Sequence, residues 1–161
     1  PCGWIADSLT EAVTLGRWSA EVTHNHPEGI KGAEAVAAAV YLARTGSSQD
    51  EVRRHMERHY YVVDFTLAEI RADYTFDETC PGSVPQALAA FYEGDSYEDC
   101  VRNAISIGGD SDTLAAITGS IAEAAFGIPD WLQERIGDYL PDPISQIQIR
   151  FDEAIKARRQ R

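Results

Sequence analysis

One helix-start signal recurs six times in this chain of 161 residues, and it constrains the fold more than any other feature. Each time, a small capping residue is followed three positions later by Glu, Gln or Asp, which is the pattern of a helix N-terminus. The six pairs are Ser8/Glu11, Ser48/Glu51, Thr66/Glu69, Ser83/Gln86, Ser96/Asp99 and Asp130/Gln133. Only the segment YYVVDF at 60–65 is strand-like, and an isolated strand has no partner. The sequence therefore predicts an all-α fold.

The segment GAEAVAAAVYLARTG at 32–46 predicts the central helix of that fold. Its residues are almost all small or apolar, so the helix can be buried on most sides, and its alanines permit close approach by neighbouring helices. Gly46 predicts the end of the helix. Because the chain length fits a single core, we expect residues 1–161 to form one helical domain.

Charge and cysteine content exclude several classes of protein. The chain has 14 Lys and Arg residues against 26 Asp and Glu residues, a net charge of −12, which argues against nucleic acid or an anionic membrane as the main partner. No apolar run reaches transmembrane length, so we expect a soluble protein. Cys2, Cys80 and Cys100 are odd in number and lack a CxxC spacing, which favours packing roles and a cytoplasmic location over disulfides or a zinc cluster.

Two acidic residues stand one residue apart, directly after two glycines, in SIGGDSDTLAAITGSIAEAAFGIP at 106–129. The preceding segment, 97–107, has helical spacing and ends at the glycines, which favour a tight turn or a positive φ. A second helix is predicted to open near Asp112 and to end at Gly127. Its inward-facing residues are expected to be Leu114, Ile117, Ile121 and Ala125.

Asp110 and Asp112 therefore lie at an elbow between two helices. Carboxylates held so close repel each other unless a cation or a positive helix terminus offsets their charge. Together with the Thr113 hydroxyl they offer three hard oxygen atoms, a set that suits Mg²⁺ or Mn²⁺ and leaves about half of an octahedral shell open. The alternative is that Asp112 caps the second helix and Asp110 is a solvated turn residue.

Four histidines and three tryptophans have ordinary structural interpretations when each is taken alone. His24 and His26 stand two apart before a proline, as surface or capping residues often do. His55 and His59 have the i, i+4 spacing that can bind zinc, but the surrounding residues are rich in Arg and Glu, so we expect a solvated helix face. The tryptophans lie in apolar stripes and are expected in the core: Trp4, Trp18 and Trp131.

Three segments, in order, resemble the ADP-ribosylglycohydrolase family. They are SAEVTHNHPEGIKGAEAVAAAVYLAR (19–44), CPGSVPQALAAFYEGDSYEDCVRNAI (80–105) and AISIGGDSDTLAAITGSIAEAAFGIP (104–129), and the likeness runs from about Trp4 to Leu132. The resemblance implies a compact orthogonal bundle of helices. It also implies a metal-dependent hydrolase with two Mg²⁺ or Mn²⁺ ions. Such an enzyme cleaves the glycosidic bond between ADP-ribose and a modified protein side chain, with arginine the first guess, or a small ADP-ribosyl compound.

The same resemblance assigns roles to individual residues. Asp110, Asp112 and Thr113 correspond to metal ligands of the family. His24 corresponds to a histidine near the phosphates or ribose of the substrate, and three further residues would line the approach to it: Gly108, Gly109 and Ser111.

The family pattern also has N-terminal parts that find no match in this chain. They carry the acids for the other metal positions, a Glu for acid/base catalysis and a Gly/Ser loop for the diphosphate. The chain therefore resembles the C-terminal portion of such an enzyme, truncated at the N-terminus, and its catalytic acid/base residue is unassigned. We expect an N-terminal partner chain or self-association to cover its apolar face. Two alternatives remain. One is a non-catalytic helical fragment that binds ADP-ribose or has a regulatory role. The other is a capped elbow that binds no substrate.

Overall fold

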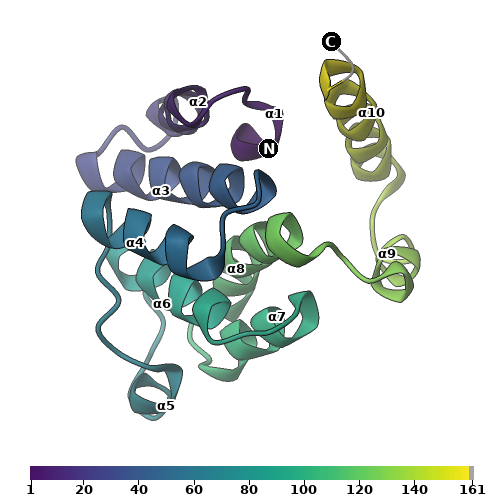
Figure 1. Ribbon diagram of the computed structural model, residues 1–161. Helices are drawn as coiled ribbons and strands as arrows, with labels where there is room; N and C mark the ends of the chain where they lie inside the picture. Colours follow the sequence, from purple (N-terminus) through teal and green to yellow (C-terminus); the bar gives the residue numbers. More distant parts are fainter. Residues whose placement is uncertain (160–161) are drawn as a thin grey trace. The chain divides into compact units, whose positions relative to one another are not determined.

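The computed structural model describes residues 1–159, which form ten α-helices and no strand (Figure 1). The predicted all-α fold is confirmed. The helices are α1 (Cys2–Ile5), α2 (Leu9–Glu21), α3 (Pro27–Arg44), α4 (Gln49–His59), α5 (Leu67–Ile70), α6 (Cys80–Tyr92), α7 (Tyr97–Ser106), α8 (Ser111–Phe126), α9 (Asp130–Ile136) and α10 (Asp142–Arg159). No described helix combines the length and the apolar character needed to cross a membrane.

The chain divides into two compact units, Pro1–Gly127 and Ile128–Arg161. The first contains α1 to α8 with the main hydrophobic core, and the second contains α9 and α10. Gly127 ends α8 with a φ of +73°, a conformation that favours glycine. That residues 1–161 fold as one domain stays a prediction.

Four of the six predicted helix starts are confirmed. The Ser8 and Ser96 hydroxyls cap α2 and α7, each accepting a hydrogen bond from the backbone N–H three residues later. Ser48 and Thr66 form complete capping boxes, in which the Glu side chain three residues later accepts from the cap's own N–H. These starts were predictable because the interaction lies within one turn.

The other two predicted starts are wrong in detail. The helix containing Ser83 begins earlier, because the Thr79 hydroxyl accepts a hydrogen bond from Gly82 N and caps α6. Ser83 instead lies inside α6 and donates to the carbonyl of Asp77. Asp130 is the first residue of α9, and no side chain caps that helix.

The central position of α3 is confirmed by its buried alanines. Ala35, Ala38 and Ala39 are at most 1% exposed. A Cβ atom placed on Gly32 would lie 2.6 Å from Cys80 Sγ, so the absence of a side chain at Gly32 lets the first turn of α6 approach α3. Small side chains therefore set how closely these helices pack.

The predicted inward face of α8 needs one correction. Leu114 and Ile121 are fully buried and Ile117 is partly buried, but Ala125 is exposed. The buried face includes Thr118, whose hydroxyl donates to the carbonyl of Ala87 at 3.0 Å. This bond satisfies a polar group that would otherwise be costly to bury.

Two of the three tryptophans expected in the core lie at the surface. Trp4 packs against the core, but Trp18 is 62% exposed and Trp131 is 52% exposed. In α2 the buried face is formed by Ala12 and Gly16, and Trp18 lies off that face. Apolar spacing identified a helix but not which of its faces is buried.

The strand-like segment 60–65 is an extended connection and not a strand. Tyr61 and Val63 point into the core while Val62 and Asp64 are exposed, which explains the alternating pattern. The carbonyl of Val63 accepts a hydrogen bond from the Arg53 guanidinium at 2.8 Å. A side chain thus replaces the neighbouring strand.

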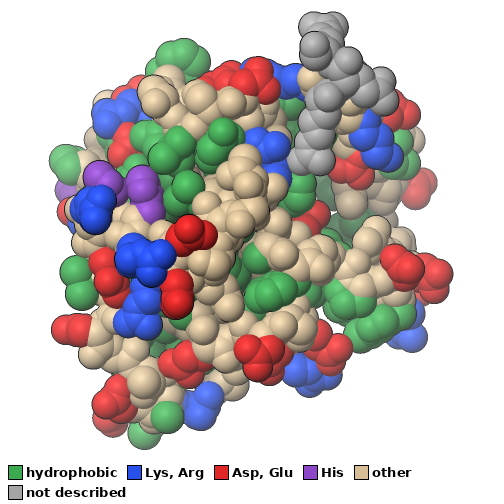
Figure 2. All heavy atoms as spheres, viewed as in Figure 1, with side chains coloured by type: hydrophobic (Ala, Val, Ile, Leu, Met, Phe, Trp, Pro, Cys, Tyr) green, Lys and Arg blue, Asp and Glu red, His purple; other side chains and the backbone are tan. Residues whose placement is uncertain are grey.

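Helix α4 carries a charged outer face, as predicted. Arg54, Arg58 and His59 are exposed, while Val52 and Met56 are fully buried. Figure 2 shows His side chains next to Lys and Arg side chains over this helix.

All three cysteines are free thiols, and Cys100 is buried. Burial raises the pKa of the Cys100 thiol from its ordinary 9.0 to about 12, and burial likewise raises the pKa of Tyr92. Because the pKa is raised in the folded state, the neutral thiol contributes its full stabilisation below pH 9. This stabilisation is lost as pH rises from 9 towards 12, because only the unfolded thiol then ionises. We therefore expect the free energy of unfolding, measured with urea, to fall between pH 9 and pH 11.

The variant Cys100→Ala supplies the control for this pH dependence. It should show a smaller fall over the same interval, because it lacks one of the groups that ionise on unfolding. Equal pH profiles for the variant and the wild type would contradict the buried state of this thiol.

Candidate functional site

The elbow between α7 and α8 has the backbone conformation that its glycines predict. Gly108 has a φ of +74° and Gly109 a φ of +63°, and L side chains rarely adopt such values. Asp110 follows as the N-cap residue of α8, but its side chain makes no capping hydrogen bond. Its carboxylate therefore remains available for another interaction.

Asp110 and Asp112 lie close together at the N-terminus of α8. The pKa of Asp112 lies below its usual value, first because its carboxylate shares a hydrogen bond with the Asp110 carboxyl group and then because backbone N–H groups donate to it. The two carboxyl groups are therefore within hydrogen-bonding reach of each other. Among the described residues neither forms an ion pair with Lys, Arg or His, so only the positive end of α8 offsets their charge.

The oxygen atoms at the elbow are of the kind that Mg²⁺ or Mn²⁺ prefers as ligands. Thr113 is exposed beside Asp112, and its hydroxyl would add a third hard oxygen to the two carboxylates. Within residues 1–159, no three or more His, Cys, Asp or Glu side chains gather to hold a metal ion. The chain thus offers two acidic ligands and a hydroxyl, with the remaining positions left for water, substrate or another polypeptide.

A loop distant in sequence packs over the elbow. A Cβ atom on Gly109 would lie 2.5 Å from the Tyr74 ring and 2.9 Å from the carbonyl oxygen of Thr75, so only glycine fits there. The Tyr74 hydroxyl donates to the carbonyl of Gly82 at 2.8 Å, which connects the elbow to the first turn of α6. Burial raises the pKa of Tyr74, and the nearby charges of Asp77 and Asp110 raise it further.

Tyr74 and Asp77 were not identified from the sequence. Tyr74 is 35 residues from Gly109, and no spacing pattern connects them. Asp77 has a local role as well, because its carboxylate accepts a hydrogen bond from Thr79 N at 2.7 Å at the start of α6.

His24 lies in the exposed connection between α2 and α3. Its Nδ1 is 2.8 Å from the Thr23 hydroxyl. His26 is the N-cap of α3, since its Nδ1 accepts a hydrogen bond from Glu28 N at 3.2 Å. The structure thus assigns His26 a capping role and leaves the His24 ring at the surface.

The contacts place the starts of three helices on one side of the first unit. Gly32, in the second turn of α3, abuts Cys80 at the start of α6, and Tyr74 joins the first turn of α6 to Gly109 before α8 (Figure 1). His24 lies before α3, in the exposed connection that follows α2. Within the described residues, no hydrogen bond or ion pair connects His24 to Asp110. Residues 108–113 lie together in one turn and helix start, and the structure does not bring His24 into contact with them.

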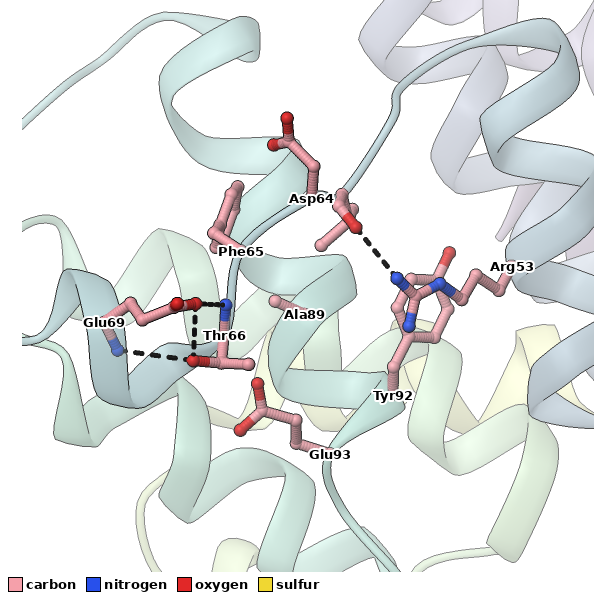
Figure 3. A pocket seen from close by; sticks show the side chains of 9 residues that line it. Arg53, Asp64, Phe65, Thr66, Glu69, Ala89, Tyr92 and Glu93 are labelled. Atoms are coloured by element: carbon pink, nitrogen blue, oxygen red, sulfur yellow. Dashed lines mark hydrogen bonds between the residues drawn. The ribbon is translucent and has the colours of Figure 1, made fainter.

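A hollow of about 370 Å³ lies at the other end of α6 (Figure 3). Its polar side chains largely bond to their own surroundings: Arg53 donates to Val63, and Thr66 and Glu69 form the capping box of α5. None of the residues predicted from the sequence to bind metal or substrate lines it. The elbow therefore remains the candidate site.

Comparisons with known proteins identify the family of this chain. Residues 1–160 match the ADP-ribosylglycohydrolase family. An uncharacterized protein of Archaeoglobus fulgidus is 33% identical over 132 residues, 71% of this chain and 43% of the relative. The ADP-ribosylarginine hydrolase Tri1 of Pseudomonas putida is 24% identical over 145 residues, 81% of this chain and 37% of the relative.

A third relative is the ADP-ribosyl-[dinitrogen reductase] glycohydrolase of Rhodospirillum rubrum, which is 25% identical over 126 residues, 71% of this chain and 40% of the relative. The chain thus spans about two-fifths of the length of the curated relatives it matches.

Proposed function

Because the chain belongs to the ADP-ribosylglycohydrolase family, we propose that it contributes the elbow with Asp110 to an active site. That active site would hydrolyse the glycosidic bond of an ADP-ribosyl group. The acidic pair at the start of α8, which forms no ion pair with a basic side chain among the described residues, is the observation that supports this proposal. The group would be carried by a protein side chain or a small acceptor. Arginine is the first candidate, since one relative is named for ADP-ribosylarginine.

We further propose Mg²⁺ or Mn²⁺ as the cofactor, held on this chain by Asp110, Asp112 and Thr113, with two ions in the complete enzyme. A divalent ion there would act as a Lewis acid that orients the ribose hydroxyls. The positive φ of Gly108 and Gly109 turns the chain so that the acids and Ser111 follow directly at the helix start.

The residues of this chain would bind and stabilise rather than transfer protons. Glycosidic cleavage passes through an oxocarbenium-like state, whose positive charge nearby carboxylates stabilise. Asp110 and Asp112 supply such charge, and Tyr74 and Gly109 hold the elbow in position. His24 would contact the phosphates or ribose. The acid/base residue would come from sequence outside this chain.

Exposed apolar side chains beside the elbow support the proposal that further polypeptide covers the site. Phe76 is 64% exposed, two residues after Tyr74, and Ile105 is 53% exposed, three residues before Gly108. We propose that these side chains pack against an N-terminal portion of the enzyme, supplied by the same or another chain, or against a second copy. A cytoplasmic location remains a prediction from the cysteine content.

The alternative function is a non-catalytic helical module that binds ADP-ribose or regulates another protein. The observation that favours it is that, within residues 1–159, no three or more His, Cys, Asp or Glu side chains gather to hold a metal ion. Hydrolysis distinguishes the two functions, because a non-catalytic module would bind ADP-ribose but release no product.

Calorimetric titration with ADP-ribose, with and without Mg²⁺, tests the proposed function. We expect Mg²⁺ to strengthen binding to this chain combined with the N-terminal portion of a relative such as Tri1. The same mixture should release ADP-ribose from ADP-ribosylarginine, and chromatography measures the ADP-ribose released. The absence of ADP-ribose binding by the combined chains would contradict both functions, and binding without hydrolysis would favour the module.

A further inference from the structure

The two histidines of α4 form a close pair outside the candidate active site. His55 and His59 are one helical turn apart, with ring centroids 4.5 Å apart and ring planes inclined by 38°. Both rings line a hollow of about 430 Å³ whose opposite wall is formed by α2 and Glu34. His55 is half-buried and His59 is exposed, so solvent reaches the pair.

The two imidazole rings are close enough to bind one metal ion together. With metal–nitrogen bonds of about 2.0–2.1 Å, an in-plane metal lies about 3.2 Å from each imidazole centroid. Two such rings bound at 90° would have centroids about 4.5 Å apart, whereas a tetrahedral angle requires about 5.2 Å. The observed 4.5 Å is therefore short enough for both rings to bind one metal ion.

The surroundings of His55 favour neutral imidazole, the form that binds metals. Burial lowers the pKa of His55, and the positive charges of His59 and Arg58 lower it further. Two other groups face the same hollow. Glu34 contributes a carboxylate, which also pairs with Arg17 at 2.6 Å, and the Tyr60 ring lies 6.1 Å from that of His55.

We propose that His55 and His59 form a binding site for a late first-row divalent metal such as Ni²⁺ or Cu²⁺, with water completing the coordination. Imidazole ligands suit these ions better than Mg²⁺, which prefers oxygen ligands, and Ni²⁺ and Cu²⁺ lie at the strong end of the affinity order of divalent first-row metals. The site is distinct in both ligand chemistry and location from the oxygen donors of the elbow.

Titration calorimetry with Ni²⁺ tests this site. We expect one Ni²⁺ to bind per chain, with at least a tenfold loss of affinity in each of His55→Gln and His59→Ala. The matched control is His26→Asn, which removes an imidazole but keeps a residue suited to capping α3. Its Ni²⁺ affinity should equal that of the wild type, and excess Mg²⁺ should not compete.

Two results would overturn the proposal. The first is unchanged Ni²⁺ affinity in both histidine variants, with circular dichroism confirming that they are folded. The second is displacement of Ni²⁺ by Mg²⁺, which would place the ion on carboxylates.

Discussion

Replacing Asp110 or Asp112 by Asn is expected to abolish binding of Mg²⁺ or Mn²⁺ at the elbow without destabilising the first unit. Each substitution removes one of the two acidic ligands. Even residues that only orient a metal ligand cost about 10–100-fold in affinity when replaced, so the loss should exceed about a hundredfold. Stability without metal should stay close to that of the wild type, because Asn is well accepted at a helix N-terminus.

A loss of metal binding without a loss of stability distinguishes a metal site from a helix cap. Asn is a good N-cap residue, so a purely structural elbow would lose neither stability nor a ligand. Calorimetry with Mn²⁺ and urea unfolding measure the two quantities. Asp64→Asn is the matched control, because it removes the same charge from an exposed position in the hollow of Figure 3. Wild-type Mn²⁺ affinity in Asp112→Asn would contradict the proposed ligand set.

The variant Phe91→Ala is expected to lower the free energy of unfolding by about 3–5 kcal/mol. Phe91 is fully buried, and its ring lies 5.7 Å from that of Tyr92 and 6.2 Å from that of Phe126. Its carbonyl also accepts a hydrogen bond from the Gln49 side chain at 2.6 Å. Removal of the ring leaves a cavity where α6 and α8 pack.

Phe76→Ala provides the comparison for this effect. Phe76 is 64% exposed, so its removal should change the stability of the isolated chain by less than about 0.5 kcal/mol. If Phe76 contacts an N-terminal portion of the enzyme, the same variant should weaken that association. Urea unfolding of both variants checks the first expectation, and a similar loss of stability in the two would contradict the assignment of the core.

Local interactions explain what the sequence could predict. Ser48 and Thr66 form their caps within one turn, and Gly108 and Gly109 adopt positive φ within a short turn, so neighbouring residues suffice to identify them. The candidate ligands are also contiguous, since Asp110, Asp112 and Thr113 belong to one helix start.

Contacts between distant segments explain what the sequence could not predict. Tyr74 meets Gly109 only because the loop before α6 folds back over the elbow. Trp18 has the spacing of a buried residue but lies off the face of α2 that contains Gly16. Val63 alternates like a strand residue because it is buried between two exposed residues, and its carbonyl bonds to Arg53 instead of a second strand. Periodicity gives the type of an element and not its neighbours.

The most direct test of the proposed metal site is a crystal structure of the chain in Mn²⁺, with the ion located by anomalous scattering. We expect a peak at about 2.0–2.3 Å from oxygen atoms of Asp110, Asp112 and Thr113. Side chains of these residues that point apart into solvent, with no peak between them at saturating Mn²⁺, would contradict a metal site at this elbow.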